Sequence, residues 1–134
     1  MKIIQTSYPL AISKKLVSIL TTEIEKSGID TSTGVIINFR DPDYNAETGG
    51  YHPVEISVDA LGKIQYITDF TYVGQGHYAE LAKELDFDFS HAQFQQMGRH
   101  FHIRDGAALY KIWQANFCHY YDWKVFDVTV QALE

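Results

Sequence analysis

The chain is short of cysteine and of basic residues, and each shortage excludes a class of protein. Cys118 is the only cysteine, so no internal disulfide can form, which favours a reducing compartment. Lys and Arg number 11 against 17 Asp and Glu, for a net charge of −6. Nucleic-acid binding depends on clustered Lys and Arg that replace phosphate counterions. No segment has such a cluster, so no nucleic-acid partner is expected.

Long apolar runs are also missing. Every apolar run is far shorter than the ~18 residues of a membrane span. The segment from Met1 to Pro9 has polar side chains where a signal peptide needs an unbroken apolar stretch. We therefore expect no membrane partner and no secretion, and predict a cytoplasmic protein.

The residues that are present have an ordinary globular composition with many aromatic side chains. Hydrophobic residues make up 46% of the chain and charged residues 21%, which excludes a disordered chain. A chain of 134 residues suits one domain whose core is stable without disulfides. The sequence therefore predicts a single domain over residues 1–134.

Two segments have the spacing of amphipathic helices. The first runs from about Ile12 to Ser27, and Gly28 ends it. The second begins after Asp105, a good N-cap residue. Its apolar stripe is expected to comprise Leu109, Ile112, Trp113, Phe117 and Tyr120.

Alternation of apolar and polar residues predicts the strands, with a short helical turn at most over residues 78–84. The strands are expected at residues 35–40, 54–58, 64–72, 85–89, within 93–103, and at 126–132. Alternate residues from Ile64 to Tyr72 are expected to share one face of a hairpin. The fold class that follows is α+β, a two-layer sandwich with a mainly antiparallel sheet and two amphipathic helices packed on one face.

The loop over residues 40–53 contains the first candidate metal site. Asp41, Asp43 and Asn45 offer oxygen ligands at alternate positions, as a calcium loop does. However, Ala46 stands where that loop needs Gly, and His52 stands where a Glu should close the site. The alternative is a surface turn rich in Asp and Asn between two strands.

A strand that contains His100 and His102 would place both side chains on one face, where they could ligate one metal ion. Such a site needs further ligands that the sequence does not place, and the alternative is a solvated histidine pair. A glycine motif at residues 74–79 matches the letters of the dinucleotide fingerprint but lacks its buried parallel strand. No cofactor is therefore predicted.

The second helix and its exit are crowded with aromatic residues. Tyr110 and Tyr121 lie off the expected apolar stripe, and exposed Tyr and Trp are typical of interfaces and of stacking on flat ligands. Asn116 falls on the stripe, where it either hydrogen-bonds irregular backbone or lines a pocket. The candidate binding residues are Tyr110, Trp113, Asn116, Tyr120, Tyr121, Trp123, His100 and His102.

Four segments together resemble a bacterial family known as domain of unknown function 2787. They are Ile12–Leu16, Asn38–Asp43, Phe94–Gly98 and Arg104–Phe117. The resemblance covers nearly the whole chain. It implies a small bacterial α+β protein without an established activity, and it carries over no catalytic residue.

No catalytic triad order, nucleophile elbow, phosphate loop or CxxC motif is present. The sequence therefore favours a non-enzymatic module that binds a protein partner or a second copy of itself through the aromatic residues. The alternative is a small-ligand binder or enzyme with a pocket built from Trp113, Asn116, His100 and His102. That alternative requires the histidine strand and the second helix to adjoin across a cleft. The charge also permits, without favouring, mimicry of nucleic acid.

Overall fold

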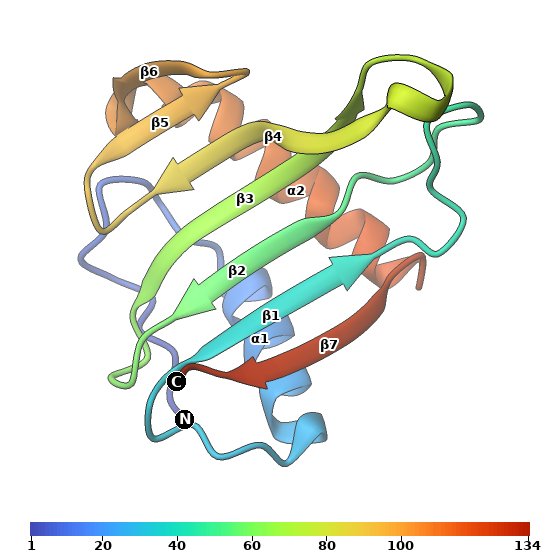
Figure 1. The fold of residues 1–134 in the computed structure, drawn as a ribbon. Helices are drawn as coiled ribbons and strands as arrows, with labels where there is room; N and C mark the ends of the chain where they lie inside the picture. The colour runs from blue at the N-terminus through green and yellow to red at the C-terminus, as the bar shows by residue number, and fades with distance from the viewer.

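The computed structural model describes all 134 residues, which form one antiparallel sheet with two helices against the same face of it (Figure 1). The elements in chain order are α1 (Lys14–Ser27), β1 (Val35–Arg40), β2 (Val54–Val58), β3 (Ile64–Val73), η1 (Gly76–Tyr78), β4 (Glu80–Asp88), β5 (Gln93–Gln96), β6 (Arg99–His102), η2 (Ile103–Gly106), α2 (Ala107–Asp122) and β7 (Asp127–Ala132).

The sheet has seven strands in the order β6-β5-β4-β3-β2-β1-β7, and all neighbouring strands are antiparallel. Only β7 departs from chain order, because the C-terminal strand returns to pair with β1 (Figure 1). The predicted α+β class is confirmed. Neither helix is long and apolar enough to cross a membrane.

The first helix agrees with its periodicity and its terminal residues. The Ser13 hydroxyl accepts a hydrogen bond from the Leu16 backbone N–H at 3.1 Å, so the helix begins at Lys14, two residues later than expected. Gly28 ends it with a φ of 65°, a left-handed conformation that glycine adopts without steric cost. The predicted first helix is confirmed.

The second helix is rotated relative to the expectation. Tyr110, which was expected off the apolar stripe, is only 2% exposed, whereas Ile112 is 60% exposed. The larger rings of Tyr110, Trp113 and Phe117 share a face at helical spacing, and burying that face removes more apolar area from water. A 3₁₀ turn, η2, precedes the helix, so Gly106 occupies the N-cap position that was predicted for Asp105.

Two β-bulges overturn the simple alternation expected along β3. The register shifts between Ser57 and Val58, so Ile64 and Ile67 both lie in the core while Tyr66 points to the opposite face. A second shift follows Asp69, where Glu84 of β4 has no partner in the ladder. A bulge adds one residue to one strand and re-aims the side chains next to it.

Two local predictions for the end of the sheet that contains β4, β5 and β6 were wrong. Residues 80–84, expected in a short helical turn, belong to β4, and only Gly76–Tyr78 are helical. The single strand expected within residues 93–103 is a hairpin of β5 and β6. Met97 and Gly98 make its turn with φ values of 47° and 83°.

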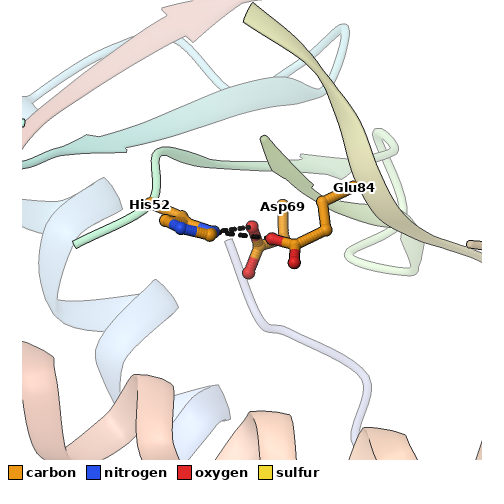
Figure 2. A group of neighbouring side chains, drawn as sticks. All are labelled: His52, Asp69 and Glu84. Atoms are coloured by element: carbon orange, nitrogen blue, oxygen red, sulfur yellow. Dashed lines mark hydrogen bonds and ion pairs between the residues drawn. The ribbon is translucent and has the colours of Figure 1, made fainter. Parts of the chain in front are cut away.

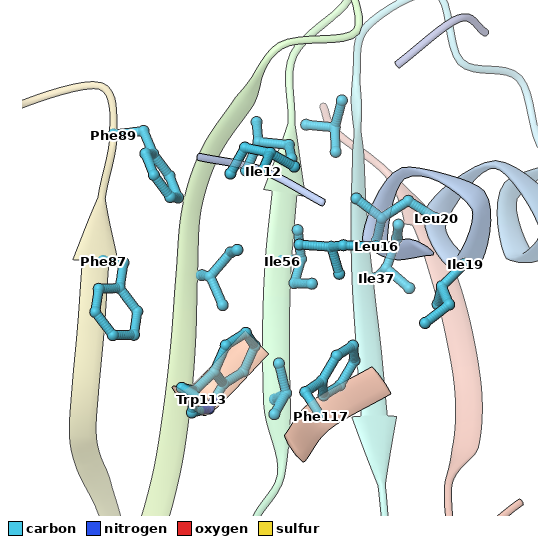
Figure 3. Packing of buried hydrophobic residues seen from close by; sticks show 14 of the residues in the cluster. Ile12, Leu16, Ile19, Leu20, Ile37, Ile56, Phe87, Phe89, Trp113 and Phe117 are labelled. Atoms are coloured by element: carbon cyan, nitrogen blue, oxygen red, sulfur yellow. The ribbon is translucent and has the colours of Figure 1, made fainter. Parts of the chain in front are cut away.

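One continuous core of 24 buried residues fills the space between the sheet and the two helices. Figure 3 shows Trp113 and Phe117 of α2 and Leu16 of α1 over the apolar side chains of the strands. Phe117 packs edge-on against Phe39 of β1, with ring centroids 4.9 Å apart, and stacks on Trp113 at 5.1 Å. These aromatic contacts fix the position of α2 across the sheet.

Candidate functional site

Three side chains from distant parts of the sequence meet beside α2, and we call them the acidic site: His52, Asp69 and Glu84 (Figure 2). Their donor atoms all lie within 4.8 Å of one another. The Nδ1 atom of His52 is 2.6 Å from Oε2 of Glu84 and 3.2 Å from Oδ1 of Asp69. The exposed fractions of the side chains are 35% for His52, 12% for Asp69 and 34% for Glu84. The site is therefore partly shielded from water but remains accessible.

Strand geometry positions the two carboxylates. Asp69 lies opposite Val54 and Leu85, on the side of the sheet that the helices cover. A carboxylate among apolar neighbours needs hydrogen-bond donors, and the Trp113 indole N–H donates to Oδ2 of Asp69 at 2.9 Å. Glu84 is the extra residue of the β4 bulge, and the bulge brings its carboxylate to the same side as Asp69.

The loop before β2 positions His52. Asp41 accepts hydrogen bonds from the backbone N–H groups of Asp43 and Tyr51, both at 2.9 Å. Asn45 accepts from two backbone N–H groups further along the loop. Asp41, Asp43 and Asn45 therefore take part in an Asp- and Asn-rich turn, which presents His52 to the sheet. The only group of three His, Cys, Asp or Glu side chains close enough to share an ion is the acidic site.

The acidic site forms one end of a cavity of about 370 Å³ between α2 and the sheet, which we call the α2 pocket. Aromatic rings make most of its remaining wall. The lining residues are Gly50, Tyr51, His52, Val54, Asp69, Glu84, Leu85, Trp113, Asn116, Phe117, Tyr120 and Phe126.

A larger and more open groove of about 710 Å³ lies between α1 and β7. The Tyr121 hydroxyl donates a hydrogen bond to Glu23 at its edge, and Lys26 lies 3.7 Å from the same Glu23 carboxylate. Of the three acids that line it, Glu23 is therefore paired with a tyrosine and a lysine, Asp122 is paired with Lys15 at 2.7 Å, and no group of three ligands converges there. The α2 pocket, where two carboxylates share one histidine, is the stronger candidate.

The contact of His52 with two carboxylates shifts the pKa values of the acidic site. The pKa of His52 is raised, first by the hydrogen bond with Asp69 and then by the negative charges of Asp69 and Glu84, which together outweigh burial. Burial raises the pKa of Glu84, the charge of Asp69 raises it further, and His52 opposes both. Two carboxylates and one imidazole leave net negative charge when both acids are ionised, so the site attracts a cation.

The structure brings three of the sequence-predicted binding residues together in the α2 pocket: Trp113, Asn116 and Tyr120. Asn116 lies on the exposed side of the helix and not on the buried stripe, because the helix is rotated relative to the expectation. The buried amide is that of Gln114, which the sequence reasoning missed.

The remaining aromatic candidates lie outside the pocket. Tyr110 is buried and donates its hydroxyl hydrogen to Gln114 at 2.8 Å. Tyr121 is half-buried, and burial together with Glu23 raises its pKa to about 12. Trp123 is 64% exposed. Trp123 is therefore the only largely exposed residue among the predicted aromatic binding residues of α2 and its exit.

The two histidines of the predicted pocket lie elsewhere. His100 and His102 are on the edge strand β6, where both are exposed. Their neighbour Phe101 pairs with the core residue Phe94, so both histidines point to the face of the sheet that the helices do not cover. The expected juxtaposition of these histidines with α2 across a cleft is not found.

Sequence reasoning missed all three residues of the acidic site as a group. In the sequence, His52 is only a mismatch to the calcium pattern, and Asp69 is only a polar position in an alternating strand. The helical turn predicted over residues 78–84 includes Glu84. A bulge has no simple sequence signature, so the pattern of the strands gave no sign that Glu84 would face Asp69.

Comparison with known proteins places the chain in a family. Residues 14–131 match the family described as "Protein of unknown function (DUF2787)". The chain belongs to this family. The resemblance carried by the sequence segments is thereby confirmed, and the DUF2787 match spans both helices and all seven strands except the last residue of β7.

Two solved structures from Vibrio cholerae are similar to this DUF2787 chain. The hypothetical protein VC0508, from the VSP-II pathogenicity island, is 36% identical with a TM-score of 0.83, over 96% of this chain and 100% of that chain. The conserved hypothetical protein VC1805, from pathogenicity island VPI-2, is 36% identical with a TM-score of 0.81, over 94% and 98%. VC1805 is described as sharing structural homology with the human P32 protein. No curated protein matched the chain.

Proposed function

We propose that the protein binds a small ring-bearing molecule in the α2 pocket. The observation that carries this proposal is the combination of aromatic walls with one strongly polar end in a single cavity of about 370 Å³. Small-molecule sites are typically concave, mostly apolar and provided with a few converging polar groups, in volumes of about 300–1,000 Å³. The α2 pocket has each of these properties.

The walls suit a flat ligand. Tyr51 from the loop and Tyr120 from α2 lie with ring centroids 4.7 Å apart at the pocket, and Trp113 and Phe117, which stack on each other, also line it. Aromatic side chains offer rigid surfaces on which another ring can stack at small entropic cost. The apolar part of the ligand is therefore assigned to this wall.

The polar residues define the other end of the ligand. Asn116 offers an amide that no other side chain of the protein engages, and Asp69 and Glu84 supply negative charge. In the metal-free protein, a ring that carries an ammonium group satisfies both ends of the pocket.

Three ring compounds of different charge test this proposal: benzylamine, indole and benzoate. Each is titrated into chelator-treated protein while backbone amide resonances are followed by NMR. We expect benzylamine to bind most tightly and benzoate least, with shifts concentrated on the residues around Trp113 and His52. Binding of none of the three would contradict the proposal.

A pair of matched variants locates the binding. Asn116→Trp places a bulky ring at the pocket and should abolish benzylamine binding. Ala115→Trp places the same ring on the opposite, exposed side of α2, outside the pocket lining, and should leave binding intact. Equal binding by both variants would place the benzylamine site elsewhere.

Self-association is a second candidate function, and one observation favours it. Ile112 and Trp123 are both largely exposed on α2 and at its C-cap, and a spacing of eleven residues puts them on the same side of a helix. A second copy of the chain could cover this ridge. We expect light scattering to show a concentration-dependent dimer that Trp123→Lys dissociates, and a monomer at all concentrations would contradict this candidate.

A further inference from the structure

We propose that His52, Asp69 and Glu84 bind one divalent first-row transition-metal ion, for which Zn²⁺ is the probe. This inference deepens the proposed function, because it names what occupies the polar end of the α2 pocket. It rests on the geometry of the three side chains, the hydrogen bond behind Asp69 and the open side of the site.

The three donor atoms are already arranged around one point. Zinc binds imidazole nitrogen and carboxylate oxygen at about 2.0–2.2 Å, which separates the ligand atoms of a tetrahedral site by roughly 3.3 Å. Nδ1 of His52 is 3.2 Å from Oδ1 of Asp69 and 2.6 Å from Oε2 of Glu84. To reach that separation, Oε2 of Glu84 has to move away from Nδ1 of His52 by several tenths of an ångström, and all three ligand atoms already lie within 4.8 Å of one another. The Glu84 side chain, a third exposed, has room to move.

A second contact fixes one of the ligands. The indole N–H of Trp113 holds Oδ2 of Asp69 at 2.9 Å and leaves Oδ1 directed at the histidine. Hydrogen bonds behind a metal ligand orient it and are a regular feature of metal sites. Trp113 therefore serves both the wall of the pocket and the orientation of Asp69.

The chemistry of the donors selects the class of ion. One imidazole and two carboxylates suit Zn²⁺, Mn²⁺, Fe²⁺, Co²⁺ or Ni²⁺, whereas Ca²⁺ and Mg²⁺ prefer oxygen ligands throughout. Two carboxylates and a dication also sum to zero charge beside a neutral imidazole. The like charges of Asp69 and Glu84, which oppose each other in the metal-free protein, would then both be compensated.

Three protein ligands would leave a coordination position open, and all three line the same cavity as Trp113, Asn116 and Tyr120. A water molecule or a donor atom of the bound molecule would complete the coordination of the ion. The metal therefore changes which molecule the pocket selects, because a carboxylate or phenolate on the ring becomes a ligand while an ammonium group is repelled.

The chain contains a natural control for this arrangement. His91 pairs with Asp88, with Nδ1 and Oδ2 2.8 Å apart, but only the Ser90 hydroxyl joins them, without a second carboxylate, and the His91 side chain is 73% exposed. The same two residue types are thus present without a converging site. His91→Gln removes an equivalent histidine without touching the α2 pocket.

The test is a calorimetric titration of Zn²⁺ into the full chain after treatment with a chelator. We expect one ion per chain, and Glu84→Gln and His52→Gln each to weaken binding by at least about tenfold, as loss of even a supporting group does at metal sites. His91→Gln should bind as the parent does. Co²⁺ in place of Zn²⁺ should give the visible absorption of a four- or five-coordinate ion, absent in Glu84→Gln. Far-UV circular dichroism confirms that each variant is folded.

Several outcomes overturn the inference. Zn²⁺ that does not saturate below about 1 mM, an affinity far below that of structural zinc sites, would do so, as would equal binding by the parent and His52→Gln. Benzylamine binding that Zn²⁺ leaves unchanged would identify an organic cation as the occupant, and the proposed function would stand alone. Zn²⁺ binding without any binding of benzylamine, indole or benzoate would support the metal site and contradict the proposed function.

Discussion

Two polar groups lie at the contact between α2 and the rest of the protein: the Gln114 side chain and the acidic site. They differ in whether other groups of the chain complete their hydrogen bonds and balance their charge. Gln114 accepts hydrogen bonds from the Ser13 backbone N–H at 3.0 Å and the Tyr110 hydroxyl at 2.8 Å, and donates to the Ala11 carbonyl at 3.3 Å. The Gln114 side chain is neutral, and its hydrogen-bond partners all belong to the chain. The acidic site, with two carboxylates around one imidazole, keeps negative charge and opens into a cavity.

The difference separates structure from function. A buried polar group whose hydrogen bonds are all made within the chain holds elements together, and the Gln114 group joins α2 to the segment that starts α1. A charged group left for solvent or a ligand to complete adds little to stability and is available for binding.

Gln114→Leu should cause the largest loss of stability. Leucine has a similar size but leaves the Ser13 N–H and the Tyr110 hydroxyl without an acceptor. Each unpaired buried group costs about 1–3 kcal/mol, so the free energy of unfolding should fall by about 3 kcal/mol in a denaturant titration. Gln131→Leu on the exposed side of β7 is the control and should change stability by no more than about 0.5 kcal/mol. A Gln114→Leu protein as stable as the parent would remove the contrast.

Trp113→Phe should affect both stability and binding. Phenylalanine keeps most of the stacking on Phe117 but removes the N–H that holds Asp69. The unpaired carboxylate oxygen should lower the free energy of unfolding by about 1–2 kcal/mol. Zn²⁺ binding should weaken by about tenfold because Asp69 loses its orientation. A loss of stability with unchanged Zn²⁺ binding would show that Trp113 serves packing alone.

Glu84→Gln should leave the stability of the metal-free protein within about 0.5 kcal/mol of the parent, as is typical of partly exposed charges. Glutamine loses the charge of the contact with His52 but also relieves the repulsion from Asp69 that helps to raise the pKa of Glu84. Thermal unfolding in chelator measures this. A large destabilisation would mean that the acidic site is a structural ion pair and not an incomplete site.

Tyr121→Phe tests the third polar contact of α2, the hydrogen bond to Glu23, through its pH dependence. Burial and Glu23 raise the pKa of Tyr121 from 10.0 to about 12, so the folded protein favours the neutral phenol. The resulting stabilisation is fully present below pH 10 and is lost as the pH rises through about 12. The difference in phenolate absorbance between the parent and Tyr121→Phe should titrate near pH 12, and a midpoint near pH 10 would contradict the contact.

Local patterns were sufficient to predict much of this fold and only part of the site. The first helix, the hairpin of β2 and β3, and β7 follow from periodicity and end signals within a few residues of sequence. The face of α2 was not predicted, because two overlapping faces are both apolar and only packing against the sheet selects the one with Tyr110.

The pocket residues on α2 were within reach of the sequence, since Trp113, Asn116 and Tyr120 lie on neighbouring turns of one helix. The acidic site was not, because His52, Asp69 and Glu84 come from a loop and two strands. Their convergence depends on a one-residue bulge and on the register of three strands. Such information resides in tertiary pairing and not in the local pattern of residues.

The return of β7 to the edge of β1 has a consequence for how the chain folds. Val35 pairs with Ala132, and the Leu133 N–H donates to the Gly34 carbonyl at 2.9 Å, so contacts of very long sequence separation complete the sheet. Contacts of this kind form slowly, because a long loop must close before they contribute. During synthesis one edge of β1 stays unpaired until the C-terminal strand has been made. That open edge is where a nascent chain is most exposed to pairing with another chain.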